Sequence, residues 1–140
     1  MGATSSRTPS LRGVVRFVEG PTDAELAWLY GNCEFTVHPA LYEGWGLPVS
    51  ESLDFDKVCL TSNGSSLEEA GEGLTELLDP FDREQWNIRI QHSWDDPNLR
   101  TARELDIKRR HARITSNHTA QVLLDLARSL TDPRAVAQDR

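Results

Sequence analysis

The stretch Tyr42-Glu43-Gly44-Trp45-Gly46-Leu47-Pro48-Val49-Ser50-Glu51 decides the fold, because it joins a glycine loop to the start of a helix. Glycine lacks a Cβ, so the backbone at Gly44 and Gly46 can take unusual angles and come close to a ligand. Pro48 suits the first turn of a helix, where its missing N–H costs nothing. The free N–H groups of a helix start attract phosphate. The stretch therefore predicts a strand, a phosphate-binding loop and a helix.

Two carboxylates frame this loop. Glu43 is expected in the loop, and Glu51 about one turn into the helix. A carboxylate is a strong acceptor for hydroxyl groups, so one acid could hold a sugar-like hydroxyl and the other a ribose. The alternative is that Glu43 is a surface acid and that Glu51 is stabilised by the helix dipole. The spacing alone leaves both interpretations open.

Short apolar runs alternate with helical patterns around the loop. Strands are predicted over 14–18, 34–38, 57–61 and, more weakly, 75–78. Helices are predicted over 23–30, from Pro48 to about 55, and over 67–70, 82–92, 97–112 and 116–130. Strands that alternate with helices indicate an α/β fold, a parallel sheet with helices on both faces.

Two polar loops are expected at one edge of this sheet. The glycine loop follows strand 34–38, and the loop Ser62-Asn63-Gly64-Ser65-Ser66 follows strand 57–61. Ligands of open parallel sheets bind beyond the carboxyl ends of the strands. The two loops are therefore expected to lie side by side at a binding edge.

Composition restricts the partners. The chain has 140 residues and a formal net charge of −7, so we expect one domain without a general attraction to nucleic acid or anionic membranes. The basic cluster of Lys108, Arg109, Arg110 and Arg113 is interpreted as a solvated helix face, although a local basic patch stays open. No run has transmembrane length, and the first twenty residues lack an apolar signal core.

Cysteine and histidine spacing indicates no metal site. Cys33 and Cys59 form no CxxC pair, and reduced buried thiols are typical of a cytoplasmic protein, which is the location we predict for the domain. A parent protein could still associate with a membrane. The sequence also lacks a P-loop and a G-x-S-x-G nucleophile elbow.

The ordered motifs resemble a known family. Glu43 to Glu51 matches the E-x7-E motif of retaining glycosyltransferases with the GT-B fold, and its surroundings are similar to glycosyltransferase family 4. The supporting motifs are Val15-Arg16-Phe17-Val18-Glu19-Gly20, the loop Ser62 to Ser66 with Leu67-Glu68-Glu69, and Asp79-Pro80. The resemblance covers about residues 14–130.

This resemblance implies the carboxyl-terminal, Rossmann-like half of a GT-B fold, with extra helices at the C-terminus. It implies a hexosyltransferase of polysaccharide or glycan biosynthesis, with a UDP- or GDP-sugar as donor and no metal or other cofactor. By resemblance, Glu43 is the catalytic candidate and holds the donor sugar. The backbone amides of Gly44, Trp45, Gly46 and Leu47 would contact the sugar and diphosphate, and Glu51 would bind the ribose.

The roles of two further side chains near the loop can each be interpreted in two ways. Trp45 could pack against the loop or stack on the ligand. His38 ends a strand, and could be a satisfied structural histidine or line the cleft, of which the structural interpretation is favoured.

The chain also departs from the family. Asp54-Phe55-Asp56 stands where relatives usually have Ala-x-Gly, and Glu68 replaces a usual proline. The amino-terminal half, with the acceptor site and a catalytic histidine region, has no counterpart here, nor has the Arg/Lys pair expected before Val14. We therefore expect a donor-binding domain over 14–131 between a disordered tail at 1–13 and a frayed one at 132–140. It would depend on an acceptor domain of the parent chain and have little or no activity alone. The alternative is a non-catalytic module for nucleotide-sugar binding or subunit pairing.

Overall fold

The computed structural model describes residues 14–113 and 116–131. Contacts within the chain divide it into two units, Met1–Cys33 and Glu34–Arg140. The first unit contains helix α1 (Asp23–Asn32), which begins with a capping box between Thr22 and Glu25. The Thr22 hydroxyl accepts from the Glu25 N–H, and the Glu25 carboxylate accepts from the Thr22 N–H. This capping box explains why the helix predicted over 23–30 begins at Asp23.

The prediction of a strand over 14–18 is wrong. These residues have no strand geometry, and their apolar side chains are exposed. A strand is held by hydrogen bonds to a neighbouring strand. The described residues of the first unit include no strand, so no neighbouring strand is available there to hold the run in strand geometry.

The second unit is built on a three-stranded parallel sheet. Its order is β1 (Thr36–His38), β2 (Cys59–Ser62) and β3 (Glu76–Leu78). Val37 pairs with Leu60, and Leu60 pairs with Glu76 on its other side. All strands point the same way, so their carboxyl ends share one edge.

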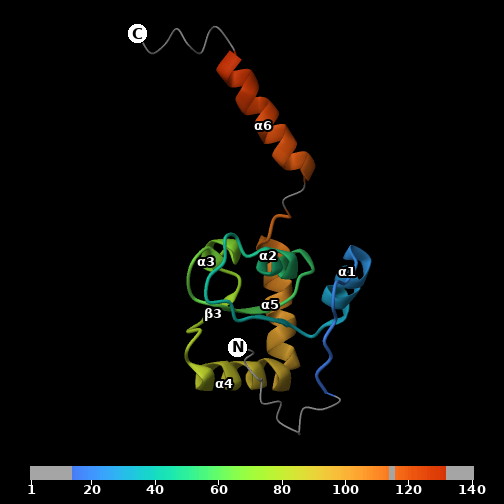
Figure 1. Cartoon of the computed structure of the whole chain (residues 1–140), viewed down its shortest axis with the longest axis vertical. Coiled ribbons are helices and arrows are strands. Elements are labelled where there is room, and N and C mark those ends of the chain that lie inside the picture. Colours follow the sequence, from blue (N-terminus) through green and yellow to red (C-terminus); the bar gives the residue numbers. More distant parts are fainter. Residues whose placement is uncertain (1–13, 114–115, 132–140) are drawn as a thin grey trace, which may run out of the picture. The chain divides into compact units, whose positions relative to one another are not determined.

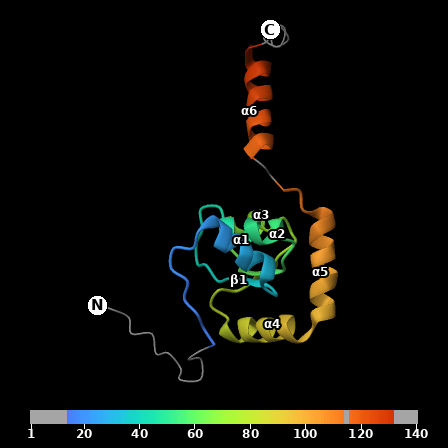
Figure 2. The same ribbon diagram turned by 90° about the vertical axis from the view of Figure 1, so that its right-hand side faces the viewer.

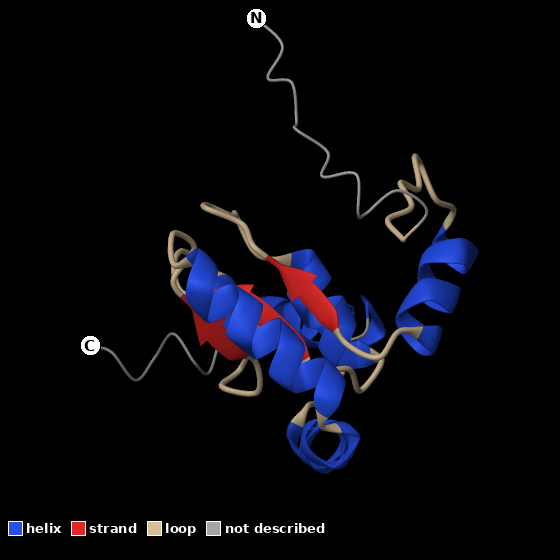
Figure 3. Ribbon diagram, turned by 90° about the horizontal axis from the view of Figure 1, so that it is seen from below, coloured by secondary structure: helices blue, strands red, loops and turns tan. Residues whose placement is uncertain are grey.

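Five described helices belong to this unit: α2 (Leu47–Asp54), α3 (Leu67–Ala70), α4 (Arg83–Asp95), α5 (Pro97–Arg110) and α6 (Ser116–Thr131). Helices α2 and α3 lie on one side of the sheet, and α4 lies on the other (Figure 1). Seen from the α4 side, this helix crosses the face of the strands (Figure 3). Helix α5 turns sharply away from α4 and runs alongside the sheet (Figure 2). This arrangement confirms the predicted α/β class with helices on both faces.

Alternate side chains of β2 supply the two faces of the core. Cys59 packs with Val49 of α2 and Leu67 of α3. Leu60 points to the opposite face and packs with Leu78 and with Trp86 of α4. Since successive strand residues face opposite sides, a run that is buried on both faces is typical of a central parallel strand.

The departure at 54–56 is accommodated by a left-handed turn. Asp56 has φ +57°, and its N–H donates to the Leu53 carbonyl oxygen at 2.9 Å. Aspartate tolerates this conformation better than most residues, although less well than glycine. The left-handed turn that ends α2 is therefore made by an aspartate.

Candidate functional site

The glycine loop lies between β1 and α2, and Gly46 fixes its shape. Gly46 is buried, has φ +87° and forms the N-cap of α2. Its carbonyl oxygen accepts from the N–H groups of Val49 at 2.9 Å and Ser50 at 3.3 Å. A Cβ at this position would lie 2.9 Å from Cδ2 of Leu67 and 3.3 Å from Cβ of Ala70. The loop therefore requires glycine, both for its backbone angle and for its close approach to α3.

The start of α2 opens toward the loop at the carboxyl edge of the sheet. The first N–H groups of a helix have no acceptor within the helix, and they carry the positive end of its dipole. Pro48 lies in the first turn, as predicted. Gly44, Trp45 and Leu47 are exposed beside this helix start. Trp45 keeps 48% of its surface exposed, so it is not a core residue, and both interpretations of its role stay open.

The loop 62–66 holds the glycine loop from the side. The hydroxyl groups of Ser65 and Ser66 both donate to the carbonyl oxygen of Glu43, Ser66 at 3.1 Å. These bonds bring together two loops that are more than twenty residues apart, as expected from their place at one edge. The serine contacts themselves were not predicted, because only the position of this polar loop could be read from the sequence.

Glu43 faces the end of β1. Its Oε1 lies 3.3 Å from Nε2 of His38, and the two side chains are 35% and 19% exposed. The distance is that of an ion pair, but Nε2 is a buried atom without a hydrogen-bond partner among the described residues. His38 is therefore not the satisfied structural histidine that the sequence favoured. The sequence signal for a role of His38 at the site is its position at the end of a strand, directly before the loop.

Glu51 lies on α2, on a different element from Glu43, and is half-buried. The neighbouring Ser52 holds α2 on the sheet. Its hydroxyl oxygen lies 2.6 Å from that of Thr36 in β1 and donates to the Pro48 carbonyl oxygen at 3.0 Å. Helix α2, and with it Glu51, is thereby fixed relative to β1.

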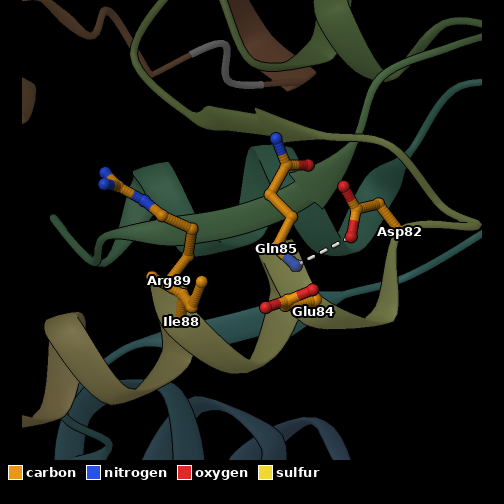
Figure 4. A pocket seen from close by; sticks show the side chains of 5 residues that line it. All are labelled: Asp82, Glu84, Gln85, Ile88 and Arg89. Atoms are coloured by element: carbon orange, nitrogen blue, oxygen red, sulfur yellow. Dashed lines mark hydrogen bonds between the residues drawn. The ribbon is translucent and has the colours of Figure 1, made fainter.

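A pocket on α4 lies apart from these residues. It has a volume of about 250 Å³ and is lined by Asp82, Glu84, Gln85, Ile88 and Arg89 (Figure 4). Asp82 there accepts from the Gln85 N–H at 2.9 Å, and Arg89 pairs with Glu76. These polar groups cap a helix and join it to the sheet, so the pocket is explained by structural contacts.

Another cavity, of about 500 Å³, lies between β3 and α5, where Leu74, Thr75, Arg103 and Ile107 are among its lining residues. Neither of these two cavities contains Glu43 or Glu51. The candidate site lies instead at the carboxyl edge of the sheet, where Gly44, Trp45 and Leu47 are exposed.

Two features are absent from the described part of the chain. Within it, no cluster of three or more histidine, cysteine, aspartate or glutamate side chains is arranged to hold a metal ion. No helix in the described ranges combines the length and apolar character that crossing a bilayer requires.

Comparison with known proteins identifies the family. The family model described as "Glycosyl transferases group 1" matches residues 6–109. The chain is also similar to the O-antigen chain mannosyltransferase B of Escherichia coli, with 32% identity over 96 residues, which are 66% of this chain. The match spans a quarter of the length of that relative. No solved structure shows a significant match. Since the family model covers well over half of the sequence, the chain belongs to the group 1 glycosyltransferases.

Proposed function

We propose that this chain binds the nucleotide-sugar donor of a retaining GT-B glycosyltransferase of the family 4 type. One observation carries the proposal. A glycine loop and a helix start meet at the carboxyl edge of a parallel sheet, with Glu43 in the loop and Glu51 in the helix. This is the edge at which open α/β sheets bind nucleotides.

Each part of the edge has a chemical role in this proposal. The amides of Gly44 to Leu47 and the start of α2 bind the diphosphate, whose negative charge matches the helix dipole. The Glu51 carboxylate accepts hydrogen bonds from the ribose hydroxyls. The Glu43 carboxylate accepts them from the donor sugar. Binding of this kind needs no metal, so a chelator is expected to leave donor affinity unchanged.

The same groups support the transfer step. The bond between the sugar and the diphosphate breaks, and negative charge grows on the leaving diphosphate. Amides and a helix start that already point at this charge stabilise the transition state. The sugar then passes, with retention, to an acceptor held by an amino-terminal domain of the parent chain.

The donor is proposed from chemistry and from the relative's name. A carboxylate that holds sugar hydroxyls is suited to a hexose, and the Escherichia coli relative is named as a mannosyltransferase. We therefore propose a hexosyltransferase of glycan biosynthesis, for which GDP-mannose is the first donor to test.

Calorimetric titration with a panel of GDP- and UDP-sugars tests the binding function. The protein is expected to bind at least one of them. Glu51→Ala is expected to lower the affinity for the free nucleoside diphosphate and for the nucleotide-sugar alike, by roughly 10-fold. This factor corresponds to about 1.4 kcal/mol for the lost charge-assisted hydrogen bonds. Glu68→Ala, an exposed acid on α3, is the matched control and is expected to leave affinity unchanged. Equal affinity of Glu51→Ala and the wild type would refute the ribose role. The absence of binding by every member of the panel would refute the function.

A further inference from the structure

Glu43 is held at two points. Its backbone carbonyl oxygen accepts from the hydroxyls of Ser65 and Ser66. Its carboxylate Oε1 lies 3.3 Å from Nε2 of His38. An isolated loop glutamate samples many rotamers, and ordering such a side chain costs up to about 2 kcal/mol. Contacts that order it in advance remove part of this cost from ligand binding.

The position of His38 is itself fixed. His38 pairs with Thr61 in the register of β1 and β2, and the Thr61 hydroxyl donates to the His38 carbonyl oxygen at 3.3 Å. Thr61 is fully buried. The imidazole therefore extends from a rigid strand end, whereas Glu43 belongs to a loop, so it is the histidine that can orient the carboxylate.

The contact between His38 and Glu43 falls short of a full hydrogen bond. Nε2 of His38 is a buried atom without a hydrogen bond among the described residues, although Oε1 of Glu43 lies at ion-pair distance. Leaving a buried polar atom unpaired is costly, and a small rotation of the carboxylate would complete the bond. Hydrogen bonds at functional sites are often long in the free protein and tighten when the ligand binds.

We propose that His38 is a positioning residue for the donor sugar. It binds one oxygen of the Glu43 carboxylate and leaves the other oxygen to accept from a sugar hydroxyl. The proposal rests on the donor-binding function proposed above. His38 acts through Glu43, so it should affect recognition of the sugar and leave recognition of the nucleoside diphosphate unchanged.

A purely structural histidine would behave differently. Its loss would loosen β1 and the glycine loop together. The affinity for the free nucleoside diphosphate would then fall as much as the affinity for the nucleotide-sugar. The ratio of these two affinities therefore separates positioning from general support of the fold.

The test compares the wild type with His38→Gln, His38→Asn and His38→Phe, using the nucleotide-sugar that the panel identifies and the matching nucleoside diphosphate. His38→Phe is expected to lower the affinity for the nucleotide-sugar by roughly 3- to 10-fold, because one hydrogen bond is lost. The affinity for the nucleoside diphosphate is expected to fall by less than about 2-fold. His38→Gln keeps a donor of similar reach, so it is expected to restore most of the sugar affinity. His38→Asn is too short and is expected to behave like His38→Phe. If His38→Phe does not fold, the Gln and Asn pair carries the same comparison.

A double variant completes the test. In a Glu43→Gln background, His38→Phe is expected to have no further effect on sugar affinity, because the two residues act as a unit. Equal losses for sugar and diphosphate, or additive losses in the double variant, would overturn the positioning role. If Glu43→Gln lowers the affinity for the nucleotide-sugar but His38→Phe does not, only this inference fails. If the wild type binds no nucleotide-sugar, or Glu43→Gln has no effect, the proposed function fails and the inference fails with it.

Discussion

At the scale of single residues, Gly46 is the position on which the loop depends most. Its φ of +87° and the 2.9 Å distance from a Cβ to Leu67 leave no room for a side chain. Gly46→Ala is expected to lower the free energy of unfolding by about 2–4 kcal/mol, from left-handed strain plus overpacking. Chemical denaturation measures this change.

Gly44→Ala is the matched control, because it changes the same residue type in the same loop. A Cβ there meets no atom within 4 Å, and its φ is not in the left-handed region. The expected change in the free energy of unfolding is below about 0.5 kcal/mol. Equal effects of the two substitutions would show that the left-handed turn at Gly46 does not hold the loop.

The sequence could predict the residues of this loop but not their contacts. Gly46 and Pro48 occupy the N-cap and the first turn that their chemistry predicts, because both preferences are local. The contacts of Glu43 with Ser65 and Ser66 join residues 22 and 23 positions apart. Such pairs depend on the register of two strands and on loop geometry, which no local pattern contains. The donor-binding roles of the acids stay a prediction.

At the scale of elements, Glu76 joins three of them. From β3, this 12% exposed carboxylate pairs with Arg89 of α4 and with Arg103 of α5, the latter at 2.5 Å. Burial by itself raises the pKa of Glu76, but the hydrogen bonds and charges of the two arginines outweigh it and hold this pKa below its usual value. The carboxylate therefore stabilises the fold in its charged form.

Glu76→Gln is expected to lower the free energy of unfolding by about 1–3 kcal/mol near neutral pH. Because the folded-state pKa is lowered, the stabilisation is present above the ordinary glutamate pKa and is lost as the pH falls through the folded-state value. Denaturation of wild type and variant at several pH values should show the two converging in acid. Glu84→Gln, on the exposed side of α4, is the control and is expected to change little. A gap that persists unchanged in acid would contradict this account.

A second junction lies at the end of α5. His111 is 8% exposed, with Nε2 2.9 Å from Asp54 at the end of α2 and Nδ1 3.2 Å from Glu72 after α3. Arg113 approaches the same Asp54 at 3.3 Å. Burial lowers the pKa of His111, but the hydrogen bonds and charges of the two carboxylates outweigh it and raise the pKa.

The raised pKa of His111 predicts a pH dependence of opposite sign. The stabilisation is fully present below the histidine pKa of the unfolded chain and is lost as the pH rises through the folded-state pKa. The stability gap between wild type and His111→Gln is thus expected to be larger near pH 6 than near pH 9. Gln91→Asn, an exposed and uncharged position on α4, should show the same gap at both pH values. A gap for His111→Gln that widens with rising pH would refute the charged junction.

Helix starts were predicted well because caps are local. Thr22, Asp82 and Asp96 each accept a hydrogen bond from a backbone N–H in the first turn that follows. Strands were less certain, since a strand exists only with a neighbour. The strands at 36–38, 59–62 and 76–78 are shorter than or shifted from the runs that predicted them, and residues 14–18 form none. The alternation of elements still predicted the parallel sheet.

At the scale of the whole molecule, family membership and the shared sheet edge give one account. The chain matches a group 1 glycosyltransferase model, and its glycine loop and the loop 62–66 meet at the carboxyl edge of the sheet. The match spans a quarter of the curated relative, so acceptor and transfer stay proposals. The central claim is that this edge binds the donor.

Mapping of backbone amide NMR shifts during titration with a nucleotide-sugar tests that claim most directly, beginning with GDP-mannose and then the UDP-sugars. Saturable shifts are expected in residues 43–51 and 62–66, with the amides of Gly44 to Leu47 among the largest. Substitution Glu68→Ala should preserve this map, whereas Glu51→Ala should require higher ligand concentrations to produce it. Shifts concentrated instead around the α4 pocket at Asp82 and Arg89, or no saturable shift with any donor, would contradict the account.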